Sequence, residues 1–266
     1  MEKKIGFIGG GNMAQAMISG ILSAGVAKPE QLFCFDANEN TLKTLKERHG
    51  ICIAAGNVEV TKTADILILA VKPQVQPAVI KEIRDAVRPE TIVVSIAAGR
   101  KIADIESDFN KEIKLVRVMP NTSAMVGEAM SGLSGNSVVK LIEVEEIKSI
   151  FNSFGKAEIV PESLMDTVVA VSGSSPAYVY LFIEAMADAA VAGGMPRAQA
   201  YTFAAQSVLG AAKMVLESGK HPGELKDMVT SPAGTTIMGV KALEDGAFRS
   251  AVMDAVIAAT ERSREL

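Results

Sequence analysis

The chain has 266 residues, 48% of them hydrophobic, and its 27 Lys and Arg against 31 Asp and Glu give a net charge of −4. This length and apolar content are those of a globular protein with one large or two ordinary domains. Because no long run of one charge sign occurs, the sequence offers no electrostatic footprint for nucleic acid or an anionic membrane, and we expect neither partner.

Cysteine and histidine residues are too few and too far apart in the sequence for metal binding, redox chemistry or a histidine-centred catalytic triad. The sequence has two cysteines, Cys34 and Cys52, and two histidines, His49 and His221. Their spacing fits neither a zinc site, nor a redox pair, nor a histidine-centred triad, so we expect no metal. Met1 leads directly into a strand rather than a signal peptide, and no uninterrupted apolar stretch reaches about 18 residues, which predicts a cytoplasmic protein.

Between residue 4 and about residue 160, short strand-like runs alternate with amphipathic helical segments. Several runs are apolar throughout, as in a parallel sheet whose two faces are both covered by helices. The pattern predicts an α/β fold with a Rossmann-like, doubly wound parallel sheet. The predicted strands are KIGFIG, LFCFD, GICIA, DILILAV, TIVVSIA, IKLVRVM and AEIV, and the predicted helices span residues 12–24, 38–49, 74–87 and 138–153.

The first strand runs into a glycine-rich motif, GFIGGGNMA, in which Gly9, Gly11 and Ala14 match G-x-G-x-x-[GA]. Gly9 permits a sharp turn and Gly11 lets the backbone approach a pyrophosphate. The amides of the following helix, which opens with Asn12 and Met13, face the phosphates. Glycine turns also arise for packing alone, but the position at the start of an alternating α/β chain favours a dinucleotide site.

Asp36 ends the second predicted strand, 22 residues beyond Ala14. An acidic side chain at this place accepts hydrogen bonds from an adenosine ribose and repels a 2′-phosphate, which favours NADH. No Lys or Arg follows before Lys43 to clamp such a phosphate. The alternative is that Asp36 caps the helix that starts near Asn38.

Three later turns are expected to border the nicotinamide, because ligands of open parallel sheets lie beyond the carboxyl ends of the strands. Each turn alone is equally consistent with an ordinary connection from strand to helix, whereas three turns on one edge favour a binding groove. The residues are Ala70, Val71, Lys72 and Pro73 of AVKPQ, residues 97–99 of SIAAG beginning with Ala97, and residues 119–122 of MPNT, which include Asn121.

After Pro161 the strand-like runs stop and the sequence reads almost entirely as helix. We therefore expect a dinucleotide-binding domain over residues 1–161 and a helical dimerisation and substrate domain over residues 162–266. The stretch 176–192 is apolar on most of its circumference, and a domain of about 105 residues encloses such a helix poorly. Burial against a second subunit is therefore favoured, with burial inside one chain as the alternative.

The residue types available for catalysis favour reduction of a C=N bond over oxidation of an alcohol. Alcohol oxidation needs a group that transfers the hydroxyl proton. The 3-hydroxyacid dehydrogenases, which share this two-domain plan, carry a lysine on the first long helix of the second domain, whereas no lysine occurs here between Lys156 and Lys213. A protonated iminium is already electrophilic, so orientation, a dry pocket and one hydrogen bond to its nitrogen suffice.

The motifs GFIGGGNMA, AVKPQ, MPNT, SGSSPAY and LKDMVTSPAGTTIMGVKALEDGAFR, in this order over essentially the whole chain, resemble the pyrroline-5-carboxylate reductase family. The resemblance implies a Rossmann-like domain followed by an all-helical domain that forms a homodimer, often in a ring of dimers, with the substrate site across the dimer. It also implies reduction of L-1-pyrroline-5-carboxylate to L-proline, the last step of proline biosynthesis, commonly with NADPH and sometimes with NADH.

By the same resemblance, Ser231 and the backbone at Gly234 and Thr235 hold the substrate carboxylate, and the Thr236 hydroxyl lies near the ring nitrogen as the catalytic group. Pro232 is expected to set the first turn of a helix that runs to about residue 245. The positive end of this helix offsets a carboxylate without an arginine. The alternative is that Ser231 only caps the helix.

The chain departs from the family in three places: Ser175 in SGSSPAY and Ala233 in SPAGTT stand where Gly is usual, and Ser123 stands where Pro is usual. Ser175, beside Pro176 in the predicted substrate pocket, adds a hydroxyl or simply tolerates the local backbone. Ala233 is expected to be a mild change, and Ser123 to alter only loop stiffness. By the resemblance, Asn57 lies near the adenosine ribose.

Two other functions stay open on the sequence alone. The first is a reductase of another cyclic imine or of a 3-hydroxyacid, and the missing lysine weakens the hydroxyacid branch. The second is a nucleotide-sensing protein that binds NAD(P) without turnover, which would have no need of an intact anion-binding turn.

Overall fold

The computed structural model describes residues 2–265. They form two compact units, one with the residues up to Gly173 together with those from Thr260 on, and one of Ser174–Ala259. The first unit extends beyond residue 161 because the following segment still packs on the sheet, where a Cβ on Gly132 would lie 2.8 Å from Val168 Cγ1. The division into two functional domains at residue 161 stays a prediction.

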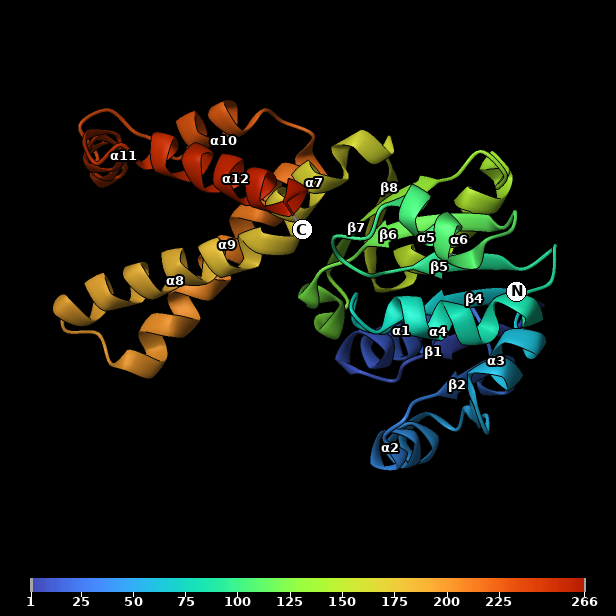
Figure 1. Cartoon of the computed structure of the whole chain (residues 1–266). Coiled ribbons are helices and arrows are strands. Elements are labelled where there is room, and N and C mark those ends of the chain that lie inside the picture. The colour runs from blue at the N-terminus through green and yellow to red at the C-terminus, as the bar shows by residue number, and fades with distance from the viewer. Residues whose placement is uncertain (1, 266) are drawn as a thin grey trace. The chain divides into compact units, whose positions relative to one another are not determined.

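One sheet forms the centre of the first unit (Figure 1). Its strands are β1 Ile5–Ile8, β2 Leu32–Phe35, β3 Cys52–Ile53, β4 Ile66–Leu69, β5 Ile92–Ser95, β6 Lys114–Met119, β7 Ala129–Gly135 and β8 Gly155–Ile159. They lie in the order β3-β2-β1-β4-β5-β6-β7-β8, and all neighbours are parallel except β6 and β7. The strand order reverses between β1 and β4, which is the switch point of a doubly wound sheet.

Helices cover both faces of this sheet. They are α1 Asn12–Ser23, α2 Glu39–His49, α3 Asn57–Thr63, α4 Gln76–Ile83, α5 Ile102–Phe109 and α6 Leu141–Phe151. Successive residues of β4 join opposite cores: Ile66 and Ile68 pack with α1, α2 and α6, whereas Leu67 and Leu69 pack with α3, α4 and α5. Both faces are therefore buried, and the predicted doubly wound fold is confirmed.

The seven predicted strands and four predicted helices are present, whereas strand β7 was not predicted. Its sequence, AMSGLSG, is rich in small residues that have low strand propensity. The glycines serve close packing instead, because a Cβ on Gly135 would lie 2.6 Å from Val139 Cγ1. Strand β7 reverses direction after β6 and extends the sheet toward β8.

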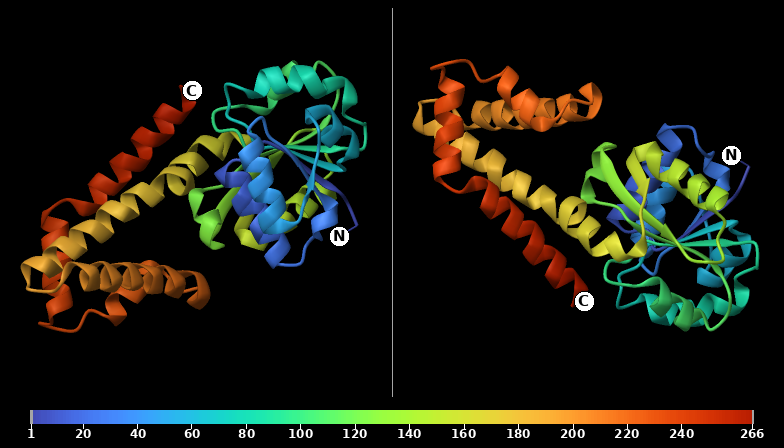
Figure 2. Two further views of the ribbon diagram at one scale, coloured as in Figure 1. Left: turned by 90° about the horizontal axis from the view of Figure 1, so that it is seen from below. Right: turned by 90° about the horizontal axis from the view of Figure 1, so that it is seen from above.

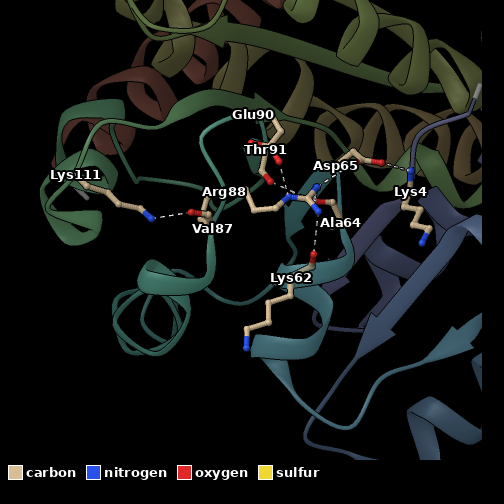
Figure 3. Close-up of polar contacts among 9 residues, drawn as sticks. All are labelled: Lys4, Lys62, Ala64, Asp65, Val87, Arg88, Glu90, Thr91 and Lys111. Carbon is tan, nitrogen blue, oxygen red and sulfur yellow. Dashed lines mark hydrogen bonds and ion pairs between the residues drawn. The ribbon is translucent and has the colours of Figure 1, made fainter.

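A network of hydrogen bonds holds the amino ends of the central strands together (Figure 3). These ends lie on the side of the sheet away from the groove-forming turns, which follow the carboxyl ends. Arg88, between α4 and β5, donates to the carbonyls of Lys62 and Ala64, both at 3.0 Å. It also donates to Asp65 Oδ1 at 2.8 Å, while Asp65 Oδ2 accepts from the Lys4 amide at 2.9 Å. The starts of β1 and β4 are thereby tied to the connection that enters β5.

The second unit is helical, with α8 and α9 lying side by side (Figure 2). Its helices are α8 Ser175–Ala192, α9 Arg197–Ser218, α10 Pro222–Met228, α11 Thr235–Asp245 and α12 Phe248–Arg264, of which the last turn, from Thr260 on, belongs to the first unit. The buried cluster of this unit consists of Ala187, Ala200 and Ala204. On α8, Tyr180 and Leu181 are 62% and 66% exposed, so a single chain does not bury the predicted apolar helix.

Among the described residues, one helical run, Glu162–Ala192, is long and apolar enough to cross a membrane by length and composition alone. This is weak evidence for a membrane span, because a helix that a second subunit covers has a similar composition. The expectation of no membrane partner stays a prediction.

Candidate functional site

A groove of about 420 Å³ lies at the carboxyl ends of the strands of the first unit. It sits beside the switch point between β1 and β4, where doubly wound sheets bind their ligands. Two of its lining residues, Ile96 and Gly173, are absent from the sequence prediction. The predicted residues that the structure brings together there are Gly11, Asn12, Met13, Ala70, Val71, Lys72, Pro73, Ala97 and Asn121.

The glycine motif has the backbone geometry that a dinucleotide requires. Gly9 has φ +98°, and a Cβ there would lie 2.7 Å from the Ala70 carbonyl oxygen. Gly11 is the N-cap of α1, no side chain caps this helix, and its first turn carries no acidic residue. A Cβ on Gly11 would meet nothing within 4 Å, and Gly11, Asn12 and Met13 line the groove, so the space beside the start of α1 is open. Such a helix start fits a pyrophosphate.

Asp36 joins the end of β2 to the glycine turn. Its Oδ2 accepts from the Gly10 amide at 2.7 Å and its Oδ1 accepts from the Asn38 amide at 2.8 Å. Asn38, rather than Asp36, caps α2, because the Asn38 side chain accepts from the Asn40 amide at 3.0 Å. Each carboxylate oxygen has two lone pairs, so both Asp36 oxygens keep capacity for a further donor.

Asn57 is the first residue of α3, and its Nδ2 donates to Glu82 Oε2 on α4 at 2.8 Å. This hydrogen bond fixes the side chain, and its expected contact with the adenosine ribose stays a prediction.

The described residues offer little for thiol or metal chemistry. Burial, with a smaller effect of the Asp36 charge, raises the pKa of the Cys34 thiol to about 12, which keeps it a neutral, unreactive group near pH 7. Between residues 2 and 265, no three side chains of His, Cys, Asp or Glu gather as a metal ion would require.

The predicted substrate turn, in the second unit, leads into α11. Gly234 is the N-cap and no side chain caps the helix, so the alternative that Ser231 is only a cap does not hold. Pro232 lies before the helix, which begins at Thr235, so the expectation that Pro232 sets the first turn is wrong. A Cβ on Gly234 would lie 2.3 Å from Ser231 Oγ, so a larger residue there would displace the Ser231 hydroxyl. The first amides of a helix lack intrahelical partners, which leaves those of Thr235 and Thr236 for an anion.

Ala233 has φ +55°, in the left-handed region that favours glycine. A non-glycine residue in this region costs about 1–2 kcal/mol. The departure from the family at this position is therefore not mild for the backbone. Ala247 has φ +54° and carries the same strain just before α12.

We expect Ala233→Gly to raise the free energy of unfolding by about 0.5–1 kcal/mol, because relief of strain exceeds the extra entropy of glycine in the unfolded chain. Chemical denaturation measures this. Ala247→Gly is the matched control: it should stabilise equally, whereas only Ala233→Gly should alter the KM of the substrate. Equal KM values in both variants would contradict a role of the turn in substrate binding.

Ser175 and Pro176 form the first turn of α8, directly after a π-helical segment, Val169–Ser174. The roles of these two residues, and of Ser231, Gly234, Thr235 and Thr236, toward the substrate stay predictions.

Comparisons with known proteins place the whole chain in one family. Residues 162–266 match the family model described as pyrroline-5-carboxylate reductase dimerisation, and residues 4–99 match the one described as NADP oxidoreductase, coenzyme F420-dependent. A solved structure of a pyrroline-5-carboxylate reductase from Coxiella burnetii has a TM-score of 0.95 and 34% identity, covering 100% of this chain and 98% of that one. The Plasmodium falciparum pyrroline carboxylate reductase, solved with NADP bound, has a TM-score of 0.87 and 35% identity, covering 99% and 98%.

The pyrroline-5-carboxylate reductase of Escherichia coli K12 is 47% identical over 266 residues, which is 100% of this chain and 99% of that protein. The similarity thus spans the dinucleotide groove, the π segment and the substrate turn alike. On this full-length identity, and in agreement with the motifs, the chain belongs to the pyrroline-5-carboxylate reductase family.

Proposed function

We infer that this chain reduces L-1-pyrroline-5-carboxylate to L-proline with NAD(P)H, the last step of proline biosynthesis. The full-length identity with the Escherichia coli reductase carries the inference, because it spans the two units. The groove and the helix start described above supply the two binding functions that the reaction needs.

Bound NAD(P)H supplies a hydride from C4 of its nicotinamide to the carbon of the C=N bond. The backbone amides of Asn12 and Met13 would hold the pyrophosphate, and Gly9 and Gly11 would allow it to approach them. Asp36 and Asn57 would hold the adenosine ribose. The nicotinamide would lie along the turns after β4, β5 and β6, with Ala70, Val71, Lys72, Pro73, Ala97 and Asn121 around it.

The substrate needs its carboxylate held and its nitrogen protonated. The start of α11 suits the carboxylate, because its dipole and free amides favour an anion without a cationic side chain. Ser231, Gly234 and Thr235 would hold that group, and Ser175 and Pro176 would form part of the pocket wall. The Thr236 hydroxyl would place one hydrogen bond at the ring nitrogen, which carries the proton that balances hydride addition and gives the amine.

We propose further that the active form is a homodimer, assembled into a ring of dimers, in the cytoplasm. The dimerisation-domain match supports self-association. The exposed apolar face of α8, with Tyr180 and Leu181, supplies a surface for it. We expect neither nucleic acid nor a membrane as a partner, since the net charge is −4 without a long run of one sign.

Purified protein is expected to oxidise NAD(P)H when given pyrroline-5-carboxylate, and Thr236→Ala is expected to lower kcat by roughly 10²-fold because the hydrogen bond at the nitrogen is lost. Absorbance at the dihydronicotinamide band measures both. Thr230→Ala is the matched control, since the Thr230 hydroxyl donates to the Lys226 carbonyl at 2.6 Å and not into the predicted site. No rate with this substrate, but turnover of another cyclic imine, would overturn the substrate assignment.

A further inference from the structure

The π-helical segment Val169–Ser174 connects the groove of the first unit to the start of α8. It follows α7 Met165–Val168 without a break and leads into Ser175. Segments of this wide helix are rare and occur frequently at functional sites. Gly173 lines the groove together with Met119, and a Cβ on Gly173 would lie 3.1 Å from Met119 Cε. The wide turn thus brings backbone to the wall of the groove.

One side chain holds this segment to the sheet. Asn121, in the turn after β6, donates from Nδ2 to the Ser172 carbonyl at 2.9 Å. Its Oδ1 accepts from the amide of Met130, in β7, at 3.2 Å. Asn121 is also the N-cap residue of the 3-10 helix Thr122–Val126, yet its side chain makes no capping hydrogen bond there. Both ends of its amide are therefore used to join the β6 turn, β7 and the π segment.

We propose that Asn121 is a positioning residue for the reduction, acting through the π segment. By holding the Ser172 carbonyl, Asn121 fixes the neighbouring Gly173 in the groove wall. The proposal rests on the proposed function. Hydride transfer is sensitive to such placement, since a misplacement of about 1 Å costs about 10²-fold in rate.

Asn136, at the other end of β7, also joins several segments through hydrogen bonds of its side-chain amide, and it provides a control. Its Nδ2 donates to Glu106 Oε1 at 2.7 Å and to the Ile113 carbonyl at 2.9 Å. Its Oδ1 accepts from the amides of Leu115 at 3.2 Å and Val139 at 3.1 Å. Asn136 does not line the groove. A purely structural role for an asparagine beside β7 would be disturbed equally at both positions.

The test compares Asn121→Asp, Asn121→Ala and Asn136→Asp in the full-length protein, at a temperature below the unfolding transition of each. Asn121→Asp keeps an acceptor for the Met130 amide but replaces the donor to Ser172 with a second oxygen. In the protein without cofactor, hydrogen exchange of peptides covering residues 169–176 should quicken in both Asn121 variants and stay unchanged in Asn136→Asp.

In the assay, both Asn121 variants should lose roughly tenfold to a hundredfold in kcat. Their dissociation constant for NAD(P)H should rise by a smaller factor than kcat falls, because Asn121 is one of several residues that line the groove. Asn136→Asp should keep the wild-type kcat.

Wild-type kcat in both Asn121 variants, or an equal loss in Asn136→Asp, would overturn the proposal. Exchange over residues 169–176 that is the same in all variants would also overturn it. Because the exchange measurement needs no turnover, it tests the Asn121 hydrogen bonds even if the wild-type protein fails to reduce pyrroline-5-carboxylate, and that failure would count against the proposed function alone.

Discussion

Gly11→Val is expected to weaken cofactor binding about a hundredfold while leaving the fold intact. A Cβ at Gly11 meets nothing within 4 Å, so a valine side chain finds room in the folded protein. That room is the space in which a pyrophosphate would approach the amides at the start of α1. We expect a loss of roughly 3 kcal/mol, about a hundredfold in the dissociation constant, measured by titration of NADH fluorescence.

Gly20→Ala is the control in the same helix. A Cβ at Gly20 would lie 2.4 Å from Phe154 Cβ, so this smaller change should lower the midpoint of thermal unfolding while leaving cofactor affinity as in the wild type. Gly11→Val should show the opposite pair of results. Wild-type affinity in Gly11→Val would mean that the pyrophosphate does not lie against this helix start.

The second large effect is expected in the choice between NADH and NADPH. Asp36 is held by the amides of Gly10 and Asn38, so its charge stays where the adenosine ribose would lie. A 2′-phosphate there would meet a fixed carboxylate, with no Lys or Arg between residues 37 and 42 to offset it. Repulsion of about 1–2 kcal/mol predicts a kcat/KM roughly fivefold to thirtyfold higher with NADH.

Asp36→Asn removes the charge and keeps one acceptor oxygen, so the ratio of kcat/KM for NADH over NADPH should fall toward one. Steady-state rates at limiting cofactor and saturating substrate measure the ratio. Glu39→Gln, which removes an exposed charge from the first turn of α2, is the control and should leave the ratio unchanged. A wild-type preference for NADPH would show that the Asp36 carboxylate does not set the selectivity.

Local sequence patterns predict most of the first unit because its strands are apolar on both faces. They also predict the end of α2, since Gly50 adopts φ +67° as the C-cap. The helix α3 escapes prediction because NVEVTKT is rich in β-branched residues, which have modest helix propensity. The helix α5 was not predicted either, although its buried residues Ile102, Ile105 and Phe109 lie at helical spacing.

The groove could be predicted because parallel strands bring the turns after their carboxyl ends to one edge, whatever their separation in the sequence. Gly173 could not be predicted, because it reaches the groove through a π turn whose Ser172 carbonyl accepts a hydrogen bond from Asn121, 51 residues away in the sequence. The strain at Ala233 likewise depends on a tight turn in which Ser231 lies against Gly234. Neither contact leaves a periodic signal in the sequence.

The buried cluster of the helical unit consists of three alanines, whose small side chains contribute little by burial. We therefore expect self-association to stabilise the folded state of this unit, so that its unfolding midpoint rises with protein concentration. Association of two chains is second order in their concentration. At low concentrations of the chain, activity should therefore increase more steeply than the amount of protein.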